Sequence, residues 1–369
     1  MSHELDLNRD RRQPLTFGRA FIRSLVAVAI SGAIAAVIFV PRELARGQSA
    51  LFVRSCEMLA SDQAVLLVKE YSLVGPISQR RCIFLHDLGS NQSAEILDLH
   101  PYEPMCIAVH APTERIFLAN EDGSIYVHQP QRPELGTALI GRHVYGFAQQ
   151  LICSPDGKTL ISLGTRGLYA WDLDSWSLRW CDFRQTFGSA VVLADSHSVL
   201  CARPEGNEGL LVELDLLTGD TREIVHRGRL TAWRSLTVSP NGRYVVCLSS
   251  NSQGMLLSRD PADRTWRSQS ITPLITGMAH VDATFSPDSN LLIVGDTEGH
   301  QLLCWDVNQE LIAFTIGDKD ESILGSKFVD QHTLLSWNSD GAIQVWDLQS
   351  RLLVQHVVLA NLAIVFPFI

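Results

Sequence analysis

Histidine and cysteine, the residue types that most often bind metals or attack substrates, are numerous in this chain, which has 12 His and 8 Cys. Their spacing does not suit that chemistry, because no two histidines have HxxxH or HxH spacing and no two cysteines form a CxxC motif. The chain also has no GxSxG nucleophile elbow, no phosphate-cradling glycine loop and no CxxCH haem motif. We therefore expect no catalytic residue, no metal site, no cofactor and no small-molecule substrate.

The cysteines lie in short apolar runs after residue 50, as Cys106, Cys247 and Cys304 illustrate. This setting is typical of small hydrophobic residues that fill strand positions. A disulfide between neighbouring strands stays open as an alternative if the chain is exported, because oxidising compartments permit it.

The charge pattern argues against nucleic acid as a partner. The net charge is −10, and the first 24 residues hold five Arg against three acidic residues, which leaves the rest of the chain at about −12. An acidic body repels the phosphate backbone, whose attraction dominates nucleic-acid affinity.

The body of the chain repeats itself with a period of 41 to 46 residues. Seven short apolar runs each end in a polar mark, at Asp87, Gln129, Asp172, Asp215, Asp260, Asp306 and Asp347. Glycines precede six of these marks, at positions 123, 167, 209, 254, 299 and 341, where we expect turns with positive φ. The turn sequences SPDG, SPNG and SPDS begin at Ser154, Ser239 and Ser286.

Each repeat holds four strand-like runs and no sustained helical periodicity. A single four-stranded sheet cannot bury both of its faces, whereas a ring of seven sheets packs face to face and hides them. The sequence therefore predicts an all-β fold, a seven-bladed β-propeller of four-stranded blades, over residues 50–369.

Two segments, SPDGKTLISLGTRGLYAWDLDSWSLRW at 154–180 and SWNSDGAIQVWDLQSRLLVQH at 336–356, resemble WD repeats. The likeness covers roughly residues 50 to 358 and is weakest in the first and fifth units. It implies a closed ring around a narrow channel, with partners docking on the blade rims and loop faces. The repeat positions it assigns are Trp171, Asp172, Trp305, Asp306, Ser336, Asp340, Trp346 and Asp347.

The same resemblance implies a hydrogen-bond network of His, Ser or Thr, Asp and Trp within a blade. The seventh unit supplies Ser336, Asp340 and Trp346, but it has Gly317-Asp318 where Gly-His is expected. The third unit supplies Ser162 and Trp171, with His143 loosely placed after Gly141. These departures make the chain a divergent member, and the network is not assumed for every blade.

The other tryptophans leave two alternatives open. Trp176, Trp180 and Trp266 are expected on outer-strand hairpins, where they either pack within the fold or form a docking surface for a protein. Ring closure is open as well. The tail after Val358 is expected to pair with the strand near residue 50, which would leave no free sheet edge, or to begin a further truncated repeat.

Residues 21–40 form a run of twenty residues whose only charge is Arg23. A helix of that length spans the hydrocarbon core of a bilayer. We expect a cytoplasmic tail at 1–20, a transmembrane helix or signal anchor at 21–40 and a linker at 41–49. Because five Arg precede the span and Arg42 and Arg46 follow it, the N-terminus is expected in the cytoplasm and the propeller on the other side.

The sequence thus favours a single-pass membrane protein whose propeller is a non-catalytic scaffold for protein partners. Two alternatives remain. One is an exported propeller enzyme resembling lactonases or quinone-dependent dehydrogenases, which would bring His, Arg and carboxylates together at one channel mouth. The other is a binding propeller freed by cleavage of 21–40 as a signal peptide, with a mature N-terminus near residue 48.

Overall fold

The computed structural model describes most of the chain beyond residue 48. Contacts divide the chain into two units, Met1–Arg46 and Gly47–Ile369, and every described residue belongs to the second. The described ranges are 49–72, 79–98, 104–132, 136–164, 166–183, 185–205, 208–228, 233–249, 254–260, 262, 265–271, 283–296, 301–317, 323–338 and 342–358.

The described residues form seven antiparallel sheets of four strands, each made from strands consecutive in sequence, which confirms the predicted seven-bladed β-propeller. Blades 1 to 4 consist of β1 Ser49–Ala60, β2 Gln63–Ser72, β3 Gln79–Asp87, β4 Gln92–Asp98, β5 Pro104–His110, β6 Arg115–Asn120, β7 Ser124–His128, β8 Thr137–Arg142, β9 Ala148–Cys153, β10 Thr159–Gly164, β11 Gly167–Asp172, β12 Ser177–Asp182, β13 Ser189–Val192, β14 Ser198–Glu205, β15 Glu208–Asp215 and β16 Thr221–Gly228.

Blades 5 to 7 consist of β17 Trp233–Val238, β18 Tyr244–Ser249, β19 Gly254–Arg259, β20 Trp266–Ser270, β21 Ala283–Phe285, β22 Leu291–Asp296, β23 Gln301–Asp306, β24 Leu311–Ile316, β25 Ile323–Phe328, β26 Thr333–Asn338, β27 Ala342–Asp347 and β28 Leu352–Val358. The single helical turn among the described residues is η1, Ala111–Thr113.

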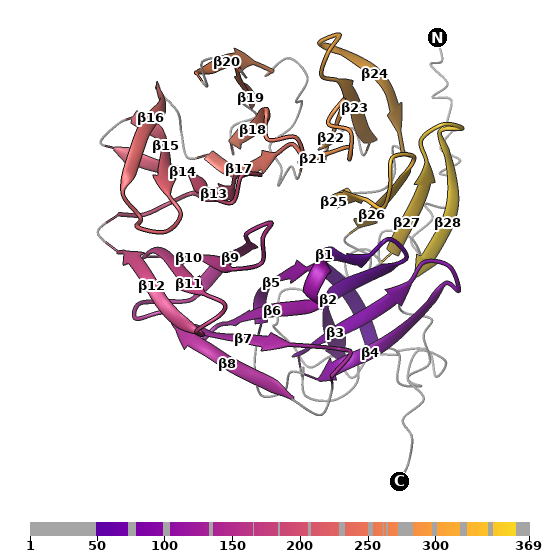
Figure 1. Ribbon diagram of the computed structural model, residues 1–369. Helices are drawn as coiled ribbons and strands as arrows, with labels where there is room; N and C mark the ends of the chain where they lie inside the picture. The colour runs from indigo at the N-terminus through magenta and orange to yellow at the C-terminus, as the bar shows by residue number, and fades with distance from the viewer. Residues whose placement is uncertain are drawn as a thin grey trace, which may run out of the picture. The chain divides into compact units, whose positions relative to one another are not determined.

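The first strands of the blades face one another around the centre of the ring. Contacts run from β1 to β5, β9, β13, β17, β21 and β25 in turn, and β25 contacts β1 again. Figure 1 shows the blades arranged around this centre, with blade 7 beside blade 1. The ring is therefore closed.

Burial falls from the middle strands of each blade to its outer strand. All six residues of β10 are buried, because neighbouring blades cover both faces of the sheet, whereas β12 has only exposed and half-buried residues. Because both faces of the middle strands are covered, their sequences are mostly apolar and do not alternate strictly between apolar and polar residues.

The turn between the first and second strands of a blade, the A–B turn, links blades 3, 5 and 6 to the next blade. In blade 3 the Asp156 N–H donates to Ser196 Oγ of blade 4 at 3.2 Å. In the same way Asn241 N–H donates to Ser289 Oγ at 3.1 Å, and Asp288 N–H donates to Gln331 Oε1 at 3.1 Å. The predicted SPDG, SPNG and SPDS turns thus stabilise blade contacts as well as hairpins.

Gly157, in the third A–B turn, allows a prediction about blade contacts. Its φ is +69°, and an added Cβ would lie 2.8 Å from Nε2 of His110 in blade 2. Gly157→Ala is expected to lower the free energy of unfolding by about 2–4 kcal/mol, from left-handed backbone strain and overlap with a buried ring. Chemical denaturation of the full chain measures this loss.

Gly136 is the matched control, because its φ is +62° but no atom lies within 4 Å of an added Cβ. Gly136→Ala should therefore cost only the backbone strain, about 1 kcal/mol. If Gly157→Ala and Gly136→Ala lower the free energy of unfolding equally, overlap with His110 does not contribute to the loss.

The expected positive φ of the marker glycines is only partly correct. Gly123 and Gly167 have φ of +87° and +126°. Gly209 lies inside β15 without positive φ, so that expectation is wrong. Gly254 is the first residue of β19, and residue 253, on which its φ depends, lies outside the described residues. The strands of blade 4 extend further than predicted, since Glu205 pairs with Glu208, and the hairpin turns before Gly209 is reached. Gly299 and Gly341 lie outside the described residues.

Blade 7 meets blade 1 through side chains. Val53, Leu66 and Phe84 of blade 1 pack in one buried cluster with Leu335 and Trp337 of blade 7. Lys327 Nζ of β25 lies 3.3 Å from Glu57 Oε2 of β1. The predicted pairing of the C-terminal tail with the first strand concerns residues 359–369, which lie outside the described residues.

Across the described ranges, no helix has the length and apolar character needed to cross a bilayer. The predicted tail at 1–20, the predicted span at 21–40 and the predicted linker up to residue 48 all lie outside those ranges.

Candidate functional site

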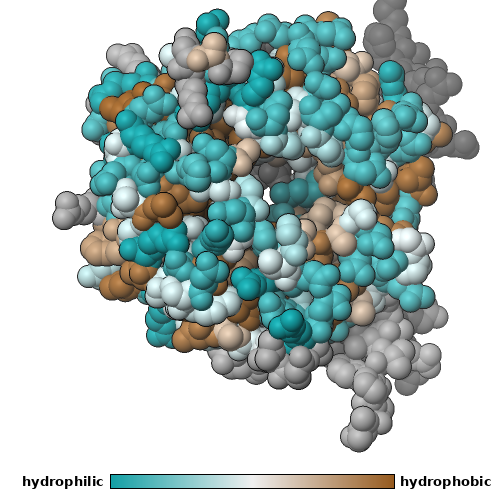
Figure 2. Space-filling model, viewed as in Figure 1, coloured by the Kyte–Doolittle hydropathy of each residue, from teal (hydrophilic) through white to brown (hydrophobic). Residues whose placement is uncertain are grey.

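The centre of the ring contains a cavity of about 490 Å³ lined by residues of the seven innermost strands. Figure 2 shows the opening in the middle of one face of the ring. Among the described lining residues the charged side chains are Glu57 and Lys327, which pair with each other. The others are hydroxyl, amide, thiol and apolar side chains.

Side chains, rather than a continuous sheet, connect the inner strands across the channel wall. The Gln150 amide of β9 donates to Ala190 O and accepts from Ala190 N–H of β13, both at 3.2 Å. Ser189 Oγ of β13 accepts from Leu236 N–H of β17 at 3.2 Å, and Thr237 Oγ1 donates to Ala283 O of β21 at 3.0 Å. These polar groups are therefore occupied in holding the ring.

Cys106, which lines the channel, is the strongest nucleophile there by residue type. Its thiol donates to Ala148 O at 3.6 Å, and burial raises its pKa to about 12. A thiol with so high a pKa is not a thiolate at neutral pH and is a poor nucleophile. All eight cysteines are free thiols in this structure, and the described residues contain no group of three or more His, Cys, Asp or Glu that could hold a metal.

Three of the four members of the network that the WD resemblance implies, His, Ser and Trp, meet in blade 3, where the turn Thr165-Arg166 carries no Asp. The Trp171 indole N–H donates to Ser162 Oγ at 2.8 Å, and this oxygen lies 2.6 Å from His143 Nε2. The His143 ring stacks on Tyr169 with ring centroids 4.0 Å apart. Burial lowers the pKa of His143 to about 4, so the ring is neutral at physiological pH. His143, loosely placed from the sequence, thus joins Ser162 and Trp171, while its Nδ1 is buried without a hydrogen-bond partner.

Stability is expected to decrease between about pH 6.5 and pH 4, because the folded pKa of His143 lies below its unfolded value near 6.5. The unfolded chain then binds the extra proton, so the stabilisation is complete above pH 6.5 and is lost as the pH falls. The loss should reach about 3 kcal/mol, measured by chemical denaturation at several pH values. His143→Gln should make the free energy of unfolding less dependent on pH in this range. If the dependence is the same in the variant as in wild type, it does not come from His143.

Blades 6 and 7 differ from blade 3. The Trp346 indole donates to Ser336 Oγ at 3.0 Å, and Ser336 Oγ donates to Gln344 Oε1 at 3.1 Å, so a glutamine occupies part of the network. Asp340 lies outside the described residues. The buried Trp305 indole N–H has no hydrogen-bond partner. The predicted repeat tryptophans therefore share a position but not a hydrogen-bond pattern.

The marker aspartates at the end of the third strand cap the turn that follows, the C–D turn. Asp172, Asp306 and Asp347 each accept backbone N–H bonds from the residues two and three positions later. In blades 3, 4 and 5 the marker Asp also pairs with an Arg seven residues later. These pairs are Asp172–Arg179, Asp215–Arg222 and Asp260–Arg267. Hydrogen bonds from Arg222 lower the pKa of Asp215 to about 2.

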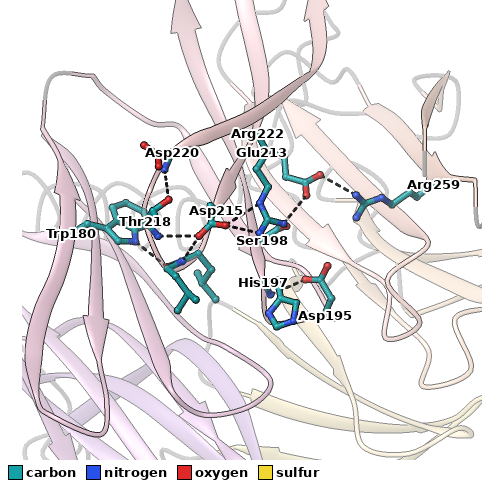
Figure 3. A network of polar contacts seen from close by, with 12 residues as sticks. Trp180, Asp195, His197, Ser198, Glu213, Asp215, Thr218, Asp220, Arg222 and Arg259 are labelled. Atoms are coloured by element: carbon teal, nitrogen blue, oxygen red, sulfur yellow. Dashed lines mark hydrogen bonds and ion pairs between the residues drawn. The ribbon is translucent and has the colours of Figure 1, made fainter. Parts of the chain in front are cut away.

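Glu213 is a buried carboxylate between blades 4 and 5, and its side chain is 3% exposed. Arg222 Nη1 lies 3.9 Å from its Oε1, and Arg259 Nη2 of blade 5 lies 3.4 Å from its Oε2 (Figure 3). The Trp266 indole N–H also donates to Oε2, at 3.4 Å. Desolvation and the Glu213 charge raise the pKa of Glu223, which is opposite Glu213 on the next strand.

The three tryptophans considered for docking have different surroundings. The Trp180 indole N–H donates to Leu216 O of blade 4 at 2.9 Å, and its ring lies over Gly219. Trp266 is half-buried beneath Arg259, whose Cζ lies 5.1 Å from the ring centroid. Trp180 and Trp266 thus join blades. Trp176 is 39% exposed and is the one of the three that offers a large free surface. Docking by any of them stays a prediction.

A second exposed apolar group lies on the connections between blades and is defined here as the linker patch, Val144, Tyr145 and Phe183. Their side chains are 65%, 50% and 48% exposed. The Tyr145 and Phe183 rings meet edge to face with centroids 6.1 Å apart, so the linker from blade 2 to blade 3 contacts the end of blade 3. Exposed aromatic side chains are typical anchors of protein interfaces.

The sequence matches no protein-family model, and no curated protein matches it. The residues of the candidate sites are therefore assigned from their geometry.

The linker patch and the Asp–Arg pairs were missed from the sequence, although a signal for each is present. The linkers RHVYGF and CDFRQTF carry Tyr145 and Phe183 outside the strands, and this position is the signal for the linker patch. The D-x6-R spacing recurs in three consecutive units and places the Arg on the fourth strand opposite the end of the third.

Proposed function

We propose that the protein is a membrane-tethered interaction scaffold, a divergent propeller of the WD-repeat type that docks protein partners on its exposed surface. The linker patch carries the proposal, because two aromatic rings and a valine, each about half exposed or more, project from the connections between blades. Large exposed apolar groups on a well-packed body cost free energy unless a partner covers them.

The channel lining supports a scaffold over a propeller enzyme. An enzyme of this shape needs several His, Arg and carboxylate side chains that converge and remain free to act on a substrate. The charged residues in the described lining, Glu57 and Lys327, neutralise each other, and the polar residues beside them join blades.

The tether rests on residues 21–40, whose length and apolar composition suit a single membrane span with the N-terminus in the cytoplasm. The full chain should remain in the membrane pellet after alkaline extraction, and added protease should degrade the propeller from the non-cytoplasmic side only. Release by alkaline extraction, or a mature N-terminus near residue 48, would refute the tether.

Docking is tested by affinity capture from detergent-solubilised membranes with three forms of the chain. Wild type is compared with the linker-patch variant Tyr145→Ser/Phe183→Ser and with Leu217→Ser, whose side chain is 59% exposed on the C–D turn of blade 4. A protein enriched by wild type and Leu217→Ser, but lost from the linker-patch variant, supports docking at the linker patch. Equal recovery by all three forms, or no protein enriched, would refute it.

A further inference from the structure

A cavity of about 420 Å³ lies beside the A–B turn of blade 2, away from the central channel. We call it the blade 2 cleft and define it by its lining, which comprises Pro112, Thr113, Glu114, Arg115, Gln129, Gln131 and Arg132. Two arginines, two glutamine amides and one carboxylate make this lining polar with a net positive charge. The surrounding chain is acidic, with a net charge of −10, so a local positive site stands out.

Arg115 is the central residue of this cleft. Its side chain is half-buried, and its Nε is fully buried without a hydrogen-bond acceptor. No carboxylate pairs with it in the described structure, and its Cζ instead lies 5.3 Å from the centre of the Trp176 ring of blade 3. The exposed part of a half-buried guanidinium without a carboxylate partner can bind an anionic ligand through charge-assisted hydrogen bonds.

Arg132 adds a second positive charge to the lining. It is exposed and has no ion pair in the described structure. Among the described lining residues the carboxylate is that of Glu114, which is exposed and forms no ion pair with either arginine. Two guanidinium groups present planar forks of N–H donors, which match a carboxylate in shape and charge.

The surroundings of the cleft suit a protein segment rather than a single small ion. The cavity is several times larger than a carboxylate group, and the side-chain amides of Gln129 and Gln131 can bond to a peptide backbone. Trp176, on which Arg115 rests, is 39% exposed. The outer strands β8 and β12 contact each other at the boundary between blades 2 and 3, and they carry the exposed side chains of Leu139 and Leu178.

We propose that the blade 2 cleft binds an acidic side chain of an extended segment of a partner protein, with Arg115 and Arg132 as the carboxylate ligands and Trp176 as the adjoining apolar contact. This inference rests on the proposed scaffold function and names the chemistry of one partner segment. It does not depend on the linker patch.

The probe is a short fluorescein-labelled peptide in which glutamate alternates with glycine, and its counterpart has glutamine in place of glutamate. Fluorescence anisotropy measures their binding to the full-length chain in detergent at low salt. The glutamate peptide should bind and the glutamine peptide should not. Arg115→Gln and Arg132→Gln should each weaken binding about tenfold, the usual loss for one charge-assisted hydrogen bond.

Arg243→Gln is the matched control. Arg243 follows the A–B turn of blade 5 and lies over Tyr244, as Arg115 follows that of blade 2 and lies over Trp176. Arg243 lines a separate cavity at blade 5, together with Asp260 and Glu310, so its loss leaves the blade 2 cleft intact and should leave peptide binding unchanged. Because Arg132 is exposed, its substitution tests the cleft even if Arg115→Gln impairs folding.

Three results would overturn the proposal. The first is that the glutamate peptide does not bind to wild type. The second is that Arg243→Gln and Arg132→Gln weaken binding of the glutamate peptide equally. The third is that inorganic phosphate binds but neither peptide does. Failure of the scaffold function is seen separately. A chain that captures no partner can still bind the glutamate peptide, and a chain that captures partners through the linker patch can fail to bind it.

Discussion

Trp171→Ala should lower the free energy of unfolding by about 4 kcal/mol, because it removes a large aromatic side chain that is 3% exposed in the cluster joining blades 2 and 3. The substitution also takes the indole N–H away from Ser162 Oγ. Urea denaturation of the full chain, followed by circular dichroism of the β-structure, measures the loss. A decrease of less than about 1 kcal/mol in the free energy of unfolding would contradict the proposed contribution of the Trp171 indole to stability.

A pair of phenylalanine variants separates the hydrogen bond from the packing. Trp171→Phe keeps most of the apolar ring but removes the indole hydrogen bond to Ser162 Oγ, which keeps its contact with His143, so it should cost about 1 kcal/mol beyond the change in packing. The Trp305 indole N–H is buried and has no partner, so Trp305→Phe loses no hydrogen bond and should cost less. Equal losses for the two variants would indicate that the network adds nothing to stability.

Glu213→Met should destabilise the protein by about 3 kcal/mol, because it removes a buried carboxylate that pairs with Arg259 and accepts from the Trp266 indole. Arg259, with a side chain only 20% exposed, would lose the carboxylate 3.4 Å from its Nη2, and the Trp266 indole would lose Glu213 Oε2 as an acceptor. Glu223 would remain beside Arg259 and Trp266. Arg222 would keep Asp215, at 2.6 Å. Chemical denaturation at neutral pH measures the change.

The double variant Glu213→Met/Arg259→Met provides the control. It removes both charges from the contact between blades 4 and 5, and apolar side chains of similar length often replace a buried ion pair at little cost. Most of the lost stability should therefore return. If the double variant is less stable than Glu213→Met alone, Arg259 stabilises the fold by a route other than Glu213, such as its position over Trp266.

The architecture could be predicted because propeller blades repeat locally. Each blade uses one uninterrupted stretch of chain, so the spacing of marks such as Asp172, Asp215 and Asp260 gives the blade count directly. The turn sequence SPDG also predicts its hairpin, since Ser154 Oγ accepts the Thr159 N–H and donates to Asp156 within five residues. Local sequence determines these features.

Contacts between blades could not be predicted in the same way. The Trp180 indole bonds to Leu216 of the next blade, and Trp266 reaches Glu213 across 53 residues. Side-chain direction across a blade boundary decides whether a rim tryptophan is exposed or buried, and a one-residue shift of a strand reverses it. The sequence therefore identified Trp176, Trp180 and Trp266 as a group, and the structure separates them.

Closure of the ring has a consequence for how such a chain can change in evolution. In the described residues no blade borrows a strand from the other end of the chain, and blades 1 and 7 meet through packed side chains and the Glu57–Lys327 pair. A gene segment that encodes one blade can therefore be duplicated or deleted without splitting a sheet. The same seam is where mechanical force applied to the two ends of the propeller would first separate the ring.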